Sequence, residues 1–257
     1  METAMTQQET SISEVETLLC LSSHGEELLH FARQQGIALT CDPDATTAYL
    51  GKTDDSRMAV VFPTRETSGA SVFHAAHILK YLQLEKAGVS ETLGRTPGES
   101  LWISRLIQAD AEATAVATCM EISAAGEDGP RQYLETSERL DLVEVAAEAI
   151  ETKQNPVPSI LAATFANESR VTRMDKTFLS SARINMSRLA KSWANGHKRP
   201  DPGPEMSARL APHAEGLFLR DPLFMGRPDA VEEALADLRQ QADTLSSVSP
   251  SLRKPAP

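Results

Sequence analysis

The stretch from Ser68 to Lys86 constrains the fold most, because it predicts a long helix that is apolar over most of its circumference. A helix of this kind is buried on nearly all sides. It nevertheless carries His74, His77 and Tyr81, which fall within roughly 60° of one another at about 100° per residue. The chain is therefore expected to fold around a helix that carries a histidine-lined stripe into the interior or into a cleft.

Short strands and further helices are predicted on either side of this element. Apolar runs at 37–41, 46–50 and 58–62 are separated by Asp-Pro-Asp and Gly-Lys-Thr-Asp-Asp turns, a spacing that predicts an antiparallel meander. Helical periodicity continues after Gly88. The other predicted helices are 12–24, 26–35, 99–124, 132–152, 159–167, 172–194 and 229–245.

The composition favours helix-on-helix packing. Aromatic residues make up only 5% of the 257 residues, and hydrophobic residues make up 41%. The core must therefore be built mainly from Ala, Leu, Val, Ile and Met, which suits helices better than an aromatic-rich β-sandwich. The expected fold class is α+β and mostly helical, with a small antiparallel sheet and a helical C-terminal extension.

The net charge and the cysteines limit which binding partners and which cellular compartment are expected. The formal net charge of −11 repels phosphate backbones and anionic membranes, so neither nucleic acid nor a membrane is an expected partner. No run approaches the roughly 18 apolar residues of a spanning helix. The polar, acidic N-terminus lacks the features of a signal peptide, and the scattered Cys20, Cys41 and Cys119 suggest no disulfide framework. A cytoplasmic protein with reduced cysteines is expected.

Four segments in this order resemble a bacterial family of zinc metallopeptidases of unknown substrate. They are the strand Met58–Phe62, the segment Phe73-His-Ala-Ala-His77, Tyr81-Leu-Gln83, and Gln108-Ala-Asp-Ala111. In that family a strand precedes a helix with His-Glu-x-x-His, and the next helix carries Glu-Ala-Asp-Ala. The resemblance covers residues 25–125 and extends weakly to Met174-Asp175. It implies a zincin-like fold.

The resemblance also implies that the catalytic motif is broken. Two histidines at i and i+4 hold zinc in His-Glu-x-x-His, and the glutamate deprotonates the bound water. Here Phe73 stands at the first ligand position, His74 at the glutamate and Gln108 at the third ligand, so that only His77 remains. Phenylalanine cannot bind a metal, and a neutral amide is a poor zinc ligand. No cofactor is expected from this ligand set, and no catalytic residue.

Other interpretations of these residues stay open. His74 and His77 can be a histidine pair whose hydrogen bonds are satisfied inside the protein, or part of a remodelled zinc site with Asp110 or Glu112. His77, Tyr81 and Asp110 would line the expected cleft, with His77 hydrogen-bonded to Asp110, to Glu112 or to water. Cys119 with His77 as nucleophile and base is a further, weaker alternative. Ser68-Gly-Ala-Ser71 is the entry of the helix, capped by Thr67 or Ser68.

These observations lead to a domain division and a function that the sequence predicts. We expect an N-terminal tail and short helix at 1–24, a zincin-like helical domain at 25–195, a linker and docking segment with a helix at 196–247, and a disordered tail at 248–257. The expected function is a catalytically inactive metallopeptidase-like protein that binds a peptide or protein partner through the remnant cleft. The alternatives are an active metal-dependent hydrolase with non-standard ligands and a structural or assembly protein.

Overall fold

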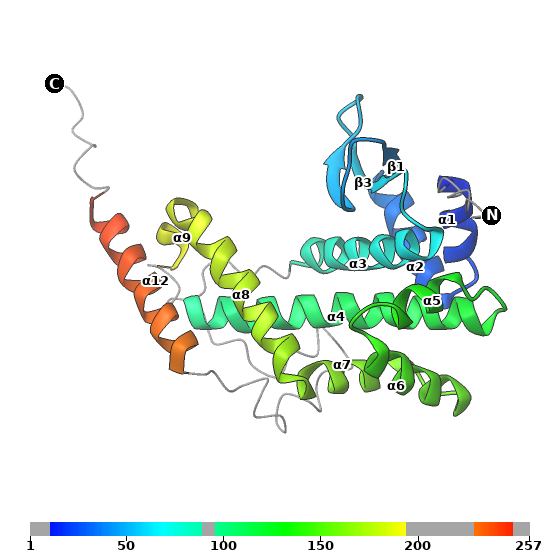
Figure 1. Cartoon of the computed structure of the whole chain (residues 1–257). Coiled ribbons are helices and arrows are strands. Elements are labelled where there is room, and N and C mark those ends of the chain that lie inside the picture. The colour runs from blue at the N-terminus through cyan, green and yellow to red at the C-terminus, as the bar shows by residue number, and fades with distance from the viewer. Residues whose placement is uncertain (1–10, 89–95, 194–228, 249–257) are drawn as a thin grey trace, which may run out of the picture. The chain divides into compact units, whose positions relative to one another are not determined.

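The computed structural model describes residues 11–88, 96–193 and 229–248, which contain ten helices and three strands (Figure 1). The predicted mostly helical α+β class is confirmed. The chain divides into two compact units, one made of Met1–Lys86 and Asp110–Ala163 and the other of Ala87–Ala109 and Thr164–Pro257. Helix α4, Pro97–Ala124, and helix α7, Pro156–Ala166, each contribute residues to both units.

The first unit contains the sheet and most of the residues singled out above. Its other helices are α1 Ile12–Leu19, α2 Ser23–Gln35, α3 Ser68–Lys86, α5 Gly129–Glu135 and α6 Leu140–Glu151. The predicted bounds of α3 are confirmed: Thr67 Oγ1 accepts a hydrogen bond from the Ala70 amide, so Thr67 caps the helix, and Gly88 with φ +86° follows its end. Gly36 ends α2 in the left-handed conformation.

The sheet has the order β1-β3-β2, with β1 Ala38–Asp42, β2 Tyr49–Lys52 and β3 Met58–Pro63. β2 pairs antiparallel with β3, whereas β1 pairs parallel with it. The expectation of an antiparallel meander is therefore wrong. Residues 43–48 carry the chain from β1 to the far side of β3, so the central strand is the last of the three in the sequence. β3 is buried from Ala59 onward, and β2 is an edge strand that is mostly exposed.

Three predicted helices are shorter or divided. The helix expected at 12–24 ends at Leu19, because Ser22 caps the separate helix α2. The helix expected at 132–152 consists of α5 and α6, separated at 136–139, where the hydroxyl of Ser137 bonds the carbonyl of Leu134. The helix expected at 172–194 is α8 Glu168–Ile184 followed by α9 Met186–Trp193.

The second unit has its own apolar core. Helices α8, α9 and α12, Asp229–Val248, bury Phe178, Leu189 and Leu238 together with Leu101 of α4. Beside these apolar residues is a buried ion pair between helices α4 and α8: the Arg105 guanidinium donates to both carboxylate oxygens of Asp175, at 2.6 and 2.8 Å.

No helix in the described ranges is both long enough and apolar enough to cross a membrane. The linker predicted at 196–204 and the tail from 249 onward lie outside the described residues.

Candidate functional site

The candidate site is built on helix α3, and a close helix contact fixes one end of that helix. A Cβ atom placed on Gly69 would lie 2.4 Å from the carbonyl oxygen of Gly129 in α5. Because Gly69 has no side chain, the backbones of α3 and α5 can approach each other directly at this point. This approach positions Tyr133 of α5 beside the first turns of α3.

His74 lies between a carboxylate from the loop before α3 and a phenol from α5. Its Nδ1 is 2.8 Å from Glu66 Oε1, and its Nε2 is 3.3 Å from the hydroxyl of Tyr133. The angle at Nδ1 is too poor for a hydrogen bond, so the Glu66 contact is an ion pair when His74 is protonated. Glu66 also accepts a hydrogen bond of 3.1 Å from Ser71. The side chain of His74 keeps 29% of its surface exposed.

Phe73, which the resemblance aligns with the first zinc ligand, places an aromatic ring beside His77. The side chain is buried, and its ring stacks on His77 with centroids 6.1 Å apart. At the N-cap of α6, Arg139 places its guanidinium carbon 4.4 Å from the centroid of the same ring, a cation–π geometry. Arg139 also donates to Glu112 at 2.9 Å. An imidazole and a guanidinium therefore both contact the ring of Phe73.

His77 is held as a neutral imidazole. Burial is the largest cause, and the nearby His74 and Arg139 add to it, so that the pKa of His77 falls to about 4. Within the described residues, His77 makes no hydrogen bond to Asp110 or Glu112. Asp110 instead lies 3.3 Å from the Lys80 ammonium, and Glu112 pairs with Arg139.

The remaining predicted residues are Tyr81, Gln108 and Cys119. Tyr81 is partly buried on α3, one turn beyond His77. Gln108 belongs to the second compact unit, where its amide donates to Ser104 at 2.9 Å. Cys119 is fully buried, and burial raises the pKa of its thiol, so the thiol remains protonated and unsuited to act as a nucleophile.

These donors do not fit a zinc ion. A zinc site needs three protein ligands in tetrahedral directions. In the described part of the chain, no three His, Cys, Asp or Glu side chains converge on one point. Asp110 and Glu112, the carboxylates expected to complete a remodelled site, are neutralised by cations. The site is therefore suited to contacts through rings, charges and hydrogen bonds.

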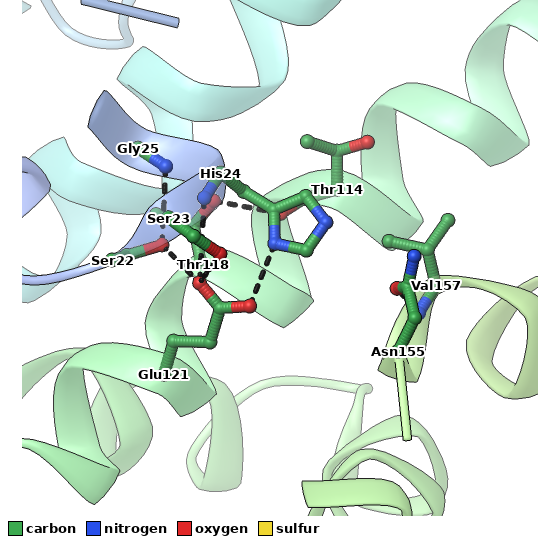
Figure 2. A network of polar contacts seen from close by, with 9 residues as sticks. All are labelled: Ser22, Ser23, His24, Gly25, Thr114, Thr118, Glu121, Asn155 and Val157. Atoms are coloured by element: carbon green, nitrogen blue, oxygen red, sulfur yellow. Dashed lines mark hydrogen bonds and ion pairs between the residues drawn. The ribbon is translucent and has the colours of Figure 1, made fainter. Parts of the chain in front are cut away.

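A second polar cluster, which the sequence did not reveal, surrounds Glu121 of α4 (Figure 2). Its carboxylate accepts hydrogen bonds from the hydroxyls of Ser22 and Ser23, at 2.6 and 3.1 Å, and from the amide of His24 at 3.4 Å. The Nδ1 atom of His24 lies 2.7 Å from the other carboxylate oxygen. The Ser22 hydroxyl in turn caps α2 through the Gly25 amide.

This cluster fixes the start of α2 against α4. Burial opposes ionisation of Glu121, but the hydrogen bonds from His24 and Ser22 outweigh it and lower its pKa to about 2. The carboxylate also lies where the N-terminal dipole of a helix favours negative charge. The sequence signal for this cluster was the Ser-Ser-His-Gly run at the start of a helix. This run does not identify the carboxylate that it binds, because Glu121 is about a hundred residues away in the sequence. The cluster contributes to stability, since the charged Glu121 holds Ser22, Ser23 and His24 at the start of α2.

No known protein family, curated protein or solved structure matches this chain.

Proposed function

We propose that this chain is a catalytically inactive metallopeptidase-like protein that binds a peptide or an extended segment of a protein partner. The observation that carries the proposal is Phe73. In the register of the resemblance, it occupies the first ligand position, and its ring is packed between His77 and Arg139. A buried aromatic ring in that position cannot hold a metal, and among the described residues no group of three His, Cys, Asp or Glu side chains could hold one.

Two partly exposed polar side chains of the same site, His74 and Tyr133, would support peptide binding. His74 is partly exposed, Tyr133 is about half-buried, and both lie beside the buried Phe73. A phenol and an imidazole can each donate and accept hydrogen bonds. These groups can therefore bond the amide and carbonyl groups of a peptide without any electrophile.

Strand β2 provides a second reason to propose an extended ligand. The Thr53 amide donates to the Arg57 carbonyl at 2.9 Å, which continues the ladder between β2 and β3. Hydrogen-bonded pairs alternate in an antiparallel ladder. Tyr49 and Gly51 therefore bond β3, while the backbone groups of Leu50 and Lys52 point away from it. Within the described residues no other strand pairs with this edge, so it can add a peptide strand, a common way in which proteins hold extended peptides.

The test is to rebuild the ligand set. The triple variant Phe73→His, His74→Glu, Gln108→Glu restores the two histidines, the base and the third carboxylate if the backbone is zincin-like. We expect this variant to bind zinc with a dissociation constant below about 1 μM by calorimetry. The same variant with His77→Ala is the matched control and should lose that binding.

A folded triple variant that binds zinc no better than the control would contradict the zincin-like register. Circular dichroism decides whether the variant folds, because the changes introduce polar groups at buried positions. An unmodified chain that hydrolyses peptides only with zinc present would instead favour the active hydrolase.

A further inference from the structure

We infer that the ligand of the β2 edge is a cationic extended peptide, with arginine or lysine side chains on the Tyr49 face of the strand. This inference rests on the proposed function, which supplies the peptide, and adds the chemical class of its side chains. Three features of the first compact unit support it: the geometry of Tyr49, the carboxylates beside it, and the charge of the unit as a whole.

Tyr49 presents an exposed aromatic ring at the free edge. The residue keeps 43% of its surface exposed. A Cβ atom on Gly51 would lie 2.8 Å from the ring carbon Cε2, so the ring extends over this glycine along the strand. Tyr49 and Gly51 share one face of β2, because alternate residues of a strand do. A cation on a neighbouring strand would meet the face of the ring, where the attraction is strongest.

Carboxylates lie directly beside this ring. The hydroxyl of Tyr49 donates to Asp42 Oδ2 at 3.2 Å, and Asp42 Oδ1 accepts the amide of Asp44 at 2.8 Å. Desolvation is the largest cause that raises the pKa of Tyr49, and the hydrogen bond and negative charge of Asp42 add to it. The phenol of Tyr49 therefore stays protonated and can donate its hydrogen bond. Asp44 is exposed, and no cation pairs with its carboxylate in the described part of the chain. An arginine over Tyr49 would therefore have the Asp42 carboxylate near it, with the exposed Asp44 two residues further along the chain.

The charge of the unit favours the same ligand. Met1–Lys86 and Asp110–Ala163 together contain 23 acidic and 9 basic residues, a net charge of −14. The other unit contains 13 acidic and 16 basic residues, a net charge of +3, and the two add to the −11 of the chain. A field of this sign attracts cations and raises their association rate. Lys52 is the cation on β2 itself, and its side chain lies on the face opposite Tyr49.

The experiment compares three peptides that differ only in charge. Each alternates valine with one other residue, which is arginine, its neutral isostere citrulline, or glutamate, and each carries a fluorophore for anisotropy with the full chain. We expect the arginine peptide to bind at least about tenfold more tightly than the citrulline peptide at about 0.05 M salt, with the difference shrinking at about 0.5 M.

Two variants locate the binding. Asp44→Asn should lower the affinity for the arginine peptide and leave that for the citrulline peptide unchanged, whereas Glu148→Gln on the exposed face of α6 should change neither. Leu50→Pro removes an outward amide without removing a donor to β3, so it should weaken every peptide. Circular dichroism and the urea midpoint check that each variant keeps its fold.

The outcomes separate the two proposals. Equal affinity of the arginine and citrulline peptides would overturn the charge preference and leave peptide binding intact. Unchanged binding of the arginine peptide to Leu50→Pro would overturn the β2 edge as its site. No binding of any of the three peptides would overturn the proposed function, and the charge preference with it.

Discussion

Replacing Glu121 by glutamine removes the negative charge to which four groups at the start of α2 are bonded. The carboxyl has a pKa of about 2 in the folded chain against an ordinary 4.5. At about 1.4 kcal/mol for each pH unit, this difference corresponds to about 3 kcal/mol of stability at neutral pH. Glutamine keeps one acceptor oxygen, so we expect Glu121→Gln to lower the free energy of unfolding by about 2–3 kcal/mol at pH 7.

The pH dependence of this loss follows from the sign of the pKa difference. A carboxyl with a lowered pKa stabilises the folded state fully above its unfolded pKa, and that stabilisation is lost as the pH falls toward the folded pKa. The wild-type advantage should therefore shrink from about 3 kcal/mol at pH 7 to about 1 kcal/mol at pH 3. Glutamine does not titrate, so the gap between variant and wild type closes by the same amount.

Urea unfolding at the two pH values measures this effect. Glu148→Gln is the matched control, because Glu148 is exposed on α6, and its change should stay within about 0.5 kcal/mol. A destabilisation by Glu121→Gln that is the same at both pH values would refute the role of the charge. A destabilisation below about 0.5 kcal/mol at pH 7 would refute the whole cluster as a stabilising feature.

Three further predictions concern other contacts. Gly69→Ala should destabilise the chain by about 2 kcal/mol in thermal unfolding, because the added Cβ meets the Gly129 carbonyl at 2.4 Å. The control Gly129→Ala adds a Cβ in open space and should leave the stability unchanged. Asp175→Asn should cost about 3–5 kcal/mol in urea unfolding, because it removes the negative charge that both hydrogen bonds from the buried guanidinium of Arg105 reach; a loss below about 1 kcal/mol would contradict this. His77 should show a pKa near 4 by NMR titration, and the lowered pKa means that this residue destabilises the fold as the pH drops below 6.5. A His77 ring that titrates near 6.5 would show that it is not enclosed.

Local signals in the sequence predicted α3 well and the split between α5 and α6 poorly. The bounds of α3 follow from Thr67, which caps its start, and from Gly88 after its end. The break at 136–139 contains neither glycine nor proline. It arises because the hydroxyls of Thr136 and Ser137 bond carbonyls of the preceding turn and compete with the helix.

The candidate site depends on this break, which explains why its sequence prediction was incomplete. Once α6 starts a new direction after 136–139, Arg139 reaches the ring of Phe73 and pairs with Glu112. The resemblance implied that Glu112 lies across from His77, whereas the side chain pairs with Arg139. Spacing along one helix predicts which residues share a face, but partners from distant helices depend on how those helices pack.

The order of the strands was also beyond the sequence pattern. The three apolar runs identified the strands to within a few residues, since alternation and turn residues act locally. Pairing is decided by which strand is buried, and β3 is the most apolar of the three. It therefore takes the centre, which leaves β2 at the free edge where the peptide is proposed to bind.

The zinc content of the purified full-length chain tests the central proposal most directly. Mass spectrometry of the metal should give less than about 0.2 zinc per chain after purification without chelator, because Phe73, His77 and Gln108 cannot supply three ligands. The variant His77→Ala should give the same low value. One zinc per chain in the unmodified protein, lost in His77→Ala, would contradict the account and make the chain a metalloprotein.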